Sequence, residues 1–307
     1  MQVYVKTFGC ASNKAESGLI RKVLMENGYE LASSAEEADA FVVNTCTVRR
    51  DTDLKVIKYL SAIKGKKVVV TGCMAAAQPA LISKHFPLFS IVSPDCVSMI
   101  PYALKSEGRA IFFEKSGLLM EPVPYRHGVK CTILVCRGCL GECSYCIVRV
   151  AKGRLRSVSP DKIKKSLVRA FESGIYEIRL TAQDTGVYGR DLGTNLPSLL
   201  SDLIGVDGNF RIRVGMFKSS SVIDFLPELI SVYRSKKIYK FAHIPVQSGS
   251  DLILERMKRG YDVKAFKRVV EELRKNFPNI TIFTDVIVGF PGESDSDFEE
   301  TCRLLRE

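Results

Sequence analysis

The sequence predicts an α/β protein of two domains, a parallel sheet domain followed by a barrel of βα units. Short apolar segments alternate with amphipathic helical patterns, and this alternation occurs twice along the 307 residues. Between the two series, residues 111–128 combine two prolines with weak periodicity, which is typical of a linker. Hydrophobic residues make up 46% of the chain and charged residues 26%, the balance of a globular protein with a sizeable core.

The first domain, residues 1–110, begins with a βαβαβ pattern. Strand-like and helical segments follow one another at 3–8, 12–28, 40–46, 54–63 and 67–73, and the pattern continues through 91–96 and 97–108. Because strands joined by crossover helices run parallel, we expect a parallel sheet with helices on both faces.

The second domain, residues 129–307, repeats the alternation. Strands are expected near 131–136, 176–183, 210–217, 238–247 and 280–290, with helices at about 160–173, 195–204, 222–235 and 250–276. Five βα units indicate a full or partial (β/α) barrel. A capped amphipathic helix over 294–307 then ends the chain before a sixth strand, so we expect the barrel to be incomplete and the chain to be a fragment of a longer protein.

Three cysteines, Cys10, Cys46 and Cys73, each close a strand of the first domain, in the contexts TFGC, NTC and TGC. Ligands of open parallel sheets bind outside the carboxyl ends of the strands, so these thiols are expected to converge in one crevice, where Gly9 and Gly72 permit close backbone approach. A single such cysteine is commonly a buried apolar residue, but three of three indicate a shared metal site. Zinc with an open position and an iron-sulfur cluster with one free iron are the alternatives, and the wide ligand spacing favours the cluster.

A second group of cysteines lies in CRGCLGECSYC, residues 136–146, directly after the first strand of the second domain. Cys139, Cys143 and Cys146 have the spacing C-x3-C-x2-C. Three thiolates on a cubic cluster leave one iron able to bind a substrate. If that substrate is S-adenosylmethionine, one electron from the cluster can break its sulfonium S–C bond and release a 5'-deoxyadenosyl radical. Zinc bound by Cys136 and these three is the rival, but zinc modules usually have a longer loop between pairs, and the spacing of ferredoxin-like clusters also differs.

This motif, with Tyr145 before its third cysteine, resembles the radical S-adenosylmethionine (SAM) superfamily. With the first three cysteines included, essentially the whole chain resembles the methylthiotransferase family. Further similar segments are CIVRVAKGRLRS, LTAQDTGVYGRDLGTNLPSLL, HIPVQSGSDLILERMKRGY and TDVIVGFPGES. Within the family, TFGCASNKAES, TGCMAAAQP and DTGVYGRDLGTNLP resemble the archaeal and eukaryotic branch that modifies N6-threonylcarbamoyladenosine.

The resemblance implies a flavodoxin-like first domain carrying a second 4Fe-4S cluster, on Cys10, Cys46 and Cys73, ahead of a partial radical SAM barrel. The barrel is expected to be truncated before its last strand, and the family's carboxy-terminal RNA-binding TRAM domain is not in the sequence. The implied activity is methylthiolation of carbon 2 of the adenine at position 37, beside the tRNA anticodon. Two SAM molecules would be used, one for the methyl group and one for the radical.

Cofactor contacts are expected from five residues of the second domain. Tyr145 belongs to the cluster motif, and Gln183 and Asp184 end the second strand, where barrel active sites lie. Arg213 could pair with the methionine carboxylate of SAM, and Gly289 lies in VIVGFPGE, which resembles the segment that packs against the SAM adenine. The alternatives are a polar turn at Gln183 and Asp184 and a structural salt bridge at Arg213.

His243 and Gln247, at the end of the fourth strand, are expected to face the barrel mouth, although a core histidine is an equal alternative for His243. The chain departs from the family pattern at Arg149, where a proline is common, and at Lys218 and Ser219, where an Asn-Pro pair is common.

The net charge of +11 is unevenly distributed, and residues 126–170 hold 11 basic and 2 acidic side chains. Such a field suits a polyanion, although a solvated surface is the alternative. Arg149, Lys152, Arg154 and Arg156 follow the cluster motif and are expected to hold RNA phosphates of the anticodon loop while the target base is splayed out.

The remaining expectations concern location and partners. A membrane span is not expected, and ten cysteines in a cytoplasmic protein indicate metal ligation or catalysis rather than disulfides. Cys96, Cys131, Cys136 and Cys302 match no ligand spacing and are expected to be structural. We expect a monomer served by a reductant of unknown identity. The alternative functions are the same chemistry on another tRNA adenosine or a ribosomal protein, or a non-catalytic iron-sulfur protein that binds RNA or senses redox state.

Overall fold

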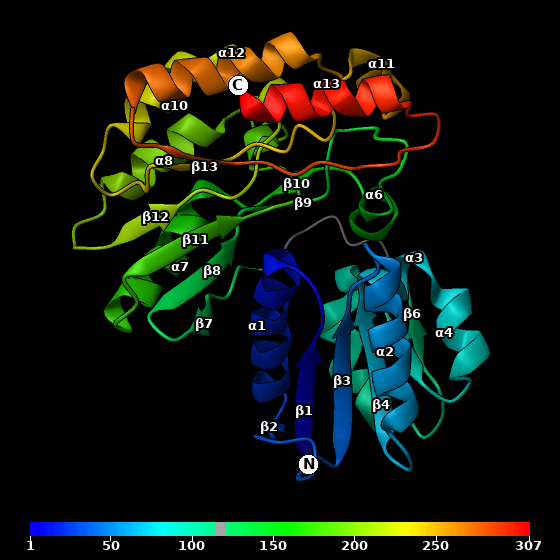
Figure 1. The fold of residues 1–307 in the computed structure, drawn as a ribbon. Coiled ribbons are helices and arrows are strands. Elements are labelled where there is room, and N and C mark those ends of the chain that lie inside the picture. Colours follow the sequence, from blue (N-terminus) through cyan, green and yellow to red (C-terminus); the bar gives the residue numbers. More distant parts are fainter. Residues whose placement is uncertain (114–120) are drawn as a thin grey trace.

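The computed structural model describes residues 1–113 and 121–307 and confirms the expected α/β fold (Figure 1). The first domain is coloured blue to blue-green in Figure 1 and the second green to red. The middle of the expected linker, residues 114–120, lies outside the described residues. Among the described helices, none has the length and apolar character needed to cross a membrane.

The first domain contains a six-stranded parallel sheet in the order β2-β1-β3-β4-β5-β6. This is the 2-1-3-4-5 order of flavodoxin-like sheets with one strand added. The strands are β1 (Gln2–Thr7), β2 (Glu30–Leu31), β3 (Ala40–Thr45), β4 (Lys67–Gly72), β5 (Ser90–Val92) and β6 (Ile111–Phe112). The sequence pattern missed the short edge strand β2, and β6 lies in the segment expected to be linker, so the sheet extends past residue 110.

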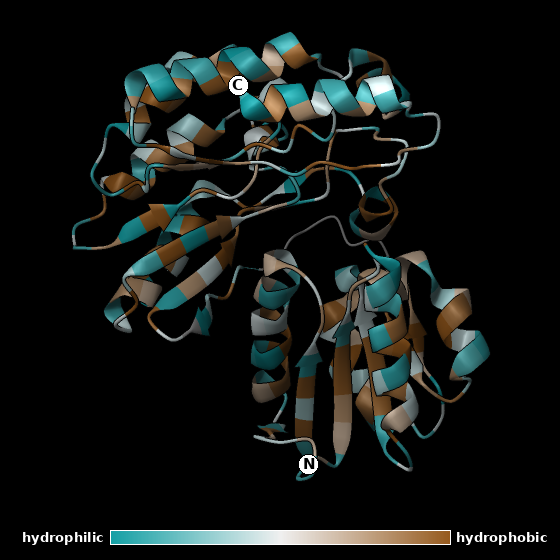
Figure 2. Ribbon diagram, viewed as in Figure 1, coloured by the Kyte–Doolittle hydropathy of each residue, from teal (hydrophilic) through white to brown (hydrophobic). Residues whose placement is uncertain are grey.

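Both faces of this sheet are buried, which explains why its strands read as continuous apolar runs (Figure 2). In β3, Val42 packs with residues of α1 and α5, whereas Phe41 and Val43 pack with residues of α2 and α4 on the other face. The helices are α1 (Ala11–Glu26), α2 (Arg50–Ala62), α3 (Cys73–Ala77), α4 (Pro79–His85), the 3-10 helix η1 (Pro94–Met99) and α5 (Ile100–Lys105).

The second domain contains the five parallel strands of a partial barrel. They are β8 (Lys130–Leu134), β11 (Glu177–Thr181), β12 (Arg211–Arg213), β13 (Phe241–His243) and β14 (Thr281–Phe283). β8, β11 and β12 form one ladder and β13 and β14 another, and a parallel bridge between Ile212 and Ile238 joins the two. β7 (Tyr125–His127), also in the expected linker, pairs antiparallel with β8.

A short hairpin that the sequence pattern did not predict holds the ends of the second cysteine loop. β9 (Cys136–Arg137) pairs antiparallel with β10 (Arg156–Ser157), so residues 138–155 form a loop closed at its base. α6 (Val148–Lys152) lies within this loop and packs against α3 of the first domain. The second group of cysteines is therefore presented from a loop that contacts the first domain.

The outer face of the barrel is covered by helices, of which α12 and α13 lie furthest from the first domain (Figure 1). They are α7 (Pro160–Glu172), α8 (Leu196–Ile204), α9 (Ser219–Val222), α10 (Leu226–Tyr233), α11 (Asp251–Arg256), α12 (Val263–Asn276) and α13 (Asp295–Arg306), with 3-10 helices η2 (Thr185–Val187) and η3 (Ile223–Phe225). The prediction of one helix over 250–276 is wrong. Lys258 and Gly260 have φ of 53° and 72°, outside the right-handed helical region, and divide it into α11 and α12.

Candidate active site

A cavity of about 920 Å³ lies between the two domains and receives cysteines from both. Cys10 and Cys73 line it from the first domain, and Cys139, Cys143 and Cys146 line it from the second. The structure thus brings together two cysteine groups that are separated in sequence by the linker and a barrel strand.

The first group sits at the carboxyl ends of β1, β3 and β4, which are adjacent in the sheet. Cys10 is exposed, whereas Cys46 and Cys73 are buried. Gly72 has φ of +89°, and a Cβ there would lie 2.4 Å from both Asn44 Oδ1 and the backbone oxygen of Thr45. Only glycine therefore fits before Cys73.

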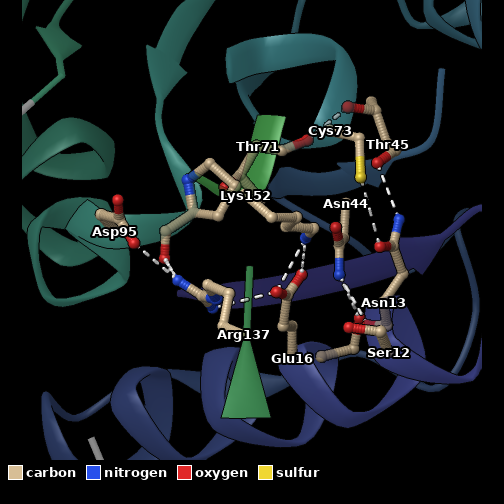
Figure 3. A network of polar contacts seen from close by, with 12 residues as sticks. Ser12, Asn13, Glu16, Asn44, Thr45, Thr71, Cys73, Asp95, Arg137 and Lys152 are labelled. Atoms are coloured by element: carbon tan, nitrogen blue, oxygen red, sulfur yellow. Dashed lines mark hydrogen bonds and ion pairs between the residues drawn. The ribbon is translucent and has the colours of Figure 1, made fainter. Parts of the chain in front are cut away.

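Asn13, on the first turn of α1, holds the three cysteine loops together (Figure 3). Its side-chain nitrogen donates to the backbone oxygens of Phe8 at 2.9 Å and Thr45 at 2.8 Å. Its Oδ1 accepts from the thiol of Cys73 at 3.6 Å. Asn44 Nδ2 in turn donates to the backbone oxygen of Asn13 at 2.8 Å. Sequence reasoning missed Asn13, since nothing in a linear pattern shows which loops a side chain on the next helix will reach.

The chemistry of this site fits an iron-sulfur cluster. Burial raises the pKa of the Cys73 thiol to about 11, so formation of a thiolate there requires a bound cation to displace the proton. Asn44 Oδ1 and Thr71 Oγ1 are buried beside Cys73 without a hydrogen-bond partner among the described residues. Across residues 1–113 and 121–307, no three His, Cys, Asp or Glu side chains are grouped as ligands of a single metal ion.

The second group lies on the loop between β9 and β10, with each cysteine partly exposed to the cavity. Gly138 closes the base of this loop, where a Cβ would lie 2.1 Å from the backbone oxygen of Arg154. The backbone nitrogen of Gly141 donates to Cys139 Sγ at 3.2 Å. Cys136, the fourth cysteine of the segment, is fully buried in β9, and its thiol donates to the backbone oxygen of Asp184. Of the four cysteines in this segment, Cys139, Cys143 and Cys146 therefore face the cavity.

Arg259, in the segment between α11 and α12, contacts this loop, and sequence reasoning missed it. Its Nη1 donates to Cys143 Sγ at 3.4 Å and to Tyr145 Oη at 3.2 Å, and its Nη2 donates to the backbone oxygen of Pro245 at 3.0 Å. Although burial opposes ionisation, the surrounding tyrosine oxygens and Cys143 keep the pKa of Arg259 above its usual range. Arg259 directly follows Lys258, which has φ of 53° in the break between α11 and α12.

Gln183 and Asp184 have different surroundings. Gln183 lines the cavity and bridges the domains, accepting from Gly138 N at 2.8 Å and donating to Ser12 Oγ at 3.0 Å. Asp184 is fully buried and accepts from Ser221 Oγ at 2.6 Å. Burial raises the pKa of Asp184, although the ammonium of Lys218, 3.8 Å away, opposes the effect. Asp184 thus contacts the cavity through Lys218, which lines it beside Cys139.

Arg213, His243 and Gln247 also line the cavity. Arg213 stacks over the ring of Phe241, with 4.1 Å between the guanidinium carbon and the ring centroid. His243 Nε2 lies 2.7 Å from Asp285 Oδ2. Gly289, by contrast, does not reach the cavity lining. It has φ of +73° and donates its backbone N–H to Glu293, as part of a turn whose Phe290 contacts the ring of Tyr145.

The four basic residues expected to hold RNA are in different environments. Arg154 is exposed, and Arg149 lines the cavity while pairing with Glu142 at 3.1 Å. Arg156 pairs with Asp95 of the first domain at 2.6 Å. Lys152 is only 2% exposed and pairs with Glu16, so the expectation of a phosphate contact does not suit its position. Lys152 was expected at the surface because the sequence does not show that the distant Glu16 is its partner.

Both domains of the chain match known protein families. Residues 133–305 match the model of the Radical SAM superfamily, and residues 2–93 match that of the Uncharacterized protein family UPF0004. The chain is 39% identical over 314 residues to the "Probable threonylcarbamoyladenosine tRNA methylthiotransferase" of Pyrococcus abyssi, covering 100% of this chain and 74% of that protein. It is 34% identical over 322 residues to the Homo sapiens "Threonylcarbamoyladenosine tRNA methylthiotransferase", covering 100% of this chain and 55% of that protein.

Similar folds occur among solved structures. The cobalamin-dependent SAM radical enzyme OxsB gives a TM-score of 0.71 at 14% identity, covering 100% of this chain and 52% of that one. The radical SAM methyltransferase TsrM from Kitasatospora setae gives 0.71 at 14% identity, covering 99% and 71%. At this identity the likeness concerns the fold alone. The sequence matches, which span the whole chain, place it in the radical SAM superfamily and, within it, in the family of threonylcarbamoyladenosine tRNA methylthiotransferases.

Proposed function

We propose that this protein methylthiolates carbon 2 of N6-threonylcarbamoyladenosine at position 37 of tRNA and uses two SAM molecules for each product. The observation that carries the proposal is the single cavity lined by Cys10 and Cys73 from one domain and by Cys139, Cys143 and Cys146 from the other. A sulfur source and a radical source must reach the same carbon atom, and one shared cavity provides for both. The names of relatives at 34–40% identity support the choice of substrate.

Each cysteine group is assigned one 4Fe-4S cluster, on Cys10, Cys46 and Cys73 in the first domain and on Cys139, Cys143 and Cys146 in the second. When bound, the clusters and SAM supply an organic radical, a methyl group and the inserted sulfur. An aromatic C–H bond is too unactivated for side-chain acid–base chemistry, so the task of the protein's own residues is to bind, orient and exclude water.

The cavity residues suit this task. Arg259 would hold Cys143 and Tyr145 in place, and Gln183 would keep the two cysteine loops in register through Gly138 and Ser12. Lys218 and Arg213 offer cations to carboxylates, one of which is the methionine carboxylate of SAM. Asp184 would orient Lys218 rather than touch SAM.

The proposed partner is the anticodon loop of tRNA at the cavity mouth. Arg149 and Arg154 would contact its phosphates while the target base is turned out of the loop into the cavity. We further propose that the protein is a cytoplasmic monomer and that a separate reductant supplies electrons one at a time.

The test is mass spectrometry of tRNA nucleosides from a strain that lacks the gene. The proposal predicts loss of the methylthio derivative of threonylcarbamoyladenosine, with the unmodified precursor retained, and its return when the gene is restored. An unchanged level of the derivative would refute it. Formation of 5'-deoxyadenosine by the reconstituted protein with SAM and dithionite is a second check, because a non-catalytic sensor would produce none.

A further inference from the structure

Lys152 belongs to the second domain but lies in the cysteine site of the first (Figure 3). It ends α6, six residues after Cys146, and its side chain is 1% exposed. The ammonium donates to both carboxylate oxygens of Glu16, at 2.7 and 2.6 Å. Glu16 is on α1, which begins directly after Cys10.

Lys152 lines the cavity that contains the first cysteine group, and Glu16 does not. Lys152 lines the cavity together with Cys10 and Cys73, whereas Glu16 faces a separate small cavity on the other side of the pair.

Glu16 has a second cationic partner besides Lys152. Arg137 Nη2 lies 2.9 Å from Glu16 and its Nη1 lies 2.8 Å from Asp95, which also pairs with Arg156. The negative charge of Glu16 is therefore shared between two buried cations, Lys152 and Arg137. Buried charge next to a cluster is one of the main determinants of its reduction potential, because each added electron increases the negative charge of the cluster and its thiolates.

We infer that Lys152 is a positioning residue of the amino-terminal cysteine site, holding a positive charge beside Cys73 that raises the reduction potential of the cluster bound there. The inference rests on the proposed second cluster. It adds that this site is complete only when the second domain is docked, since the cation comes from the loop that carries the other three cysteines. Docking of the second domain on the first is thereby coupled to the reduction potential of the cluster in the first domain.

The experiment uses the full chain with Cys139, Cys143 and Cys146 changed to alanine, so that one cluster remains. After anaerobic reconstitution, iron and sulfide are counted, and the one-electron reduction of the cluster from its 2+ to its 1+ state by dithionite is followed by electron paramagnetic resonance. Lys152→Met is expected to shift the midpoint potential to a more negative value and Glu16→Gln to a more positive one. Lys152→Arg, which keeps the charge, is expected to stay close to the parent protein.

The double variant Lys152→Met with Glu16→Leu addresses folding, because replacing both partners of a buried ion pair with apolar residues is commonly tolerated. Its potential is expected to lie between those of the parent and Lys152→Met. A purely structural role would give no shifts of opposite sign for the two partners, so equal potentials in all folded variants would overturn the inference. If the parent itself binds no iron, the proposed second cluster is refuted instead, and the two failures are distinguishable.

Discussion

Lys152 Nζ lies 2.6 Å from Glu16 Oε2, although 136 positions separate these residues in the sequence. Both side chains are almost completely buried. The pair connects the helix that follows the first cysteine of one group to the loop that carries the other group. Two further contacts connect the same two domains: Arg137 pairs with Glu16, and Gln183 donates to Ser12. Together these contacts hold the two cysteine groups at a fixed separation.

Loss of one partner of this pair is expected to destabilise the metal-free protein. Lys152→Met leaves the Glu16 carboxylate buried with Arg137 as its remaining cation, and breaking such a pair costs about 3 kcal/mol. Denaturant unfolding followed by circular dichroism measures the free energy. The double variant with Glu16→Leu should recover most of the loss, and a single variant as stable as the parent would show that the pair does not hold the domains.

Gly72→Ala is expected to remove iron from the first cysteine group, since the added Cβ would overlap Asn44 Oδ1 and the Thr45 backbone at 2.4 Å. Gly65→Ala is the matched control, because Gly65 also has positive φ, of +65°, but an added Cβ there meets nothing within 4 Å. The control should cost about 1 kcal/mol, and Gly72→Ala about 2 kcal/mol more because of overpacking. Equal iron content in the two variants would contradict the proposed geometry.

Arg259→Met is expected to weaken the second cluster site, since Arg259 donates to Cys143 and Tyr145. Loss of such an outer contact typically lowers metal affinity or activity by roughly 10- to 100-fold. Iron retention during chelator challenge and SAM affinity by equilibrium dialysis are the measurements. Arg268→Met, on the exposed side of α12, is the charge-matched control and should behave as the parent protein. Identical retention in both variants would rule out the role of Arg259.

Arg154→Gln should weaken tRNA binding without altering iron content. A single lost phosphate contact reduces the slope of log affinity against log salt concentration by about 1. Binding measured by filter retention at several salt concentrations gives this slope. Lys264→Gln on α12, outside the cavity lining, removes the same charge and should leave the slope unchanged. If both variants give the same slope, the basic field acts only through net charge.

Much of this arrangement could be predicted from the sequence, for definite physical reasons. The strands of the first domain are buried on both faces, so apolar runs mark them, and the carboxyl ends of parallel strands meet at one edge, so Cys10, Cys46 and Cys73 could be grouped. Local spacing likewise marked Cys139, Cys143 and Cys146.

What could not be predicted depends on contacts between distant segments. Lys152 was expected at the surface because the sequence does not show that Glu16, in the other domain, is its partner. Asp184 was expected to contact the cofactor because the sequence does not show that Ser221, 37 residues away, is its partner. Arg259 donates to Cys143, which lies 116 positions away in the sequence. Patterns along the chain report local periodicity and strand ends, and these three residues depend on neither.

Counting iron and sulfide in the anaerobically reconstituted protein shows whether the cavity between the domains serves two clusters. About eight irons per chain are expected, falling by half when either Cys10, Cys46 and Cys73 or Cys139, Cys143 and Cys146 are replaced by alanine. A value of about four that one of these replacements leaves unchanged would contradict this expectation.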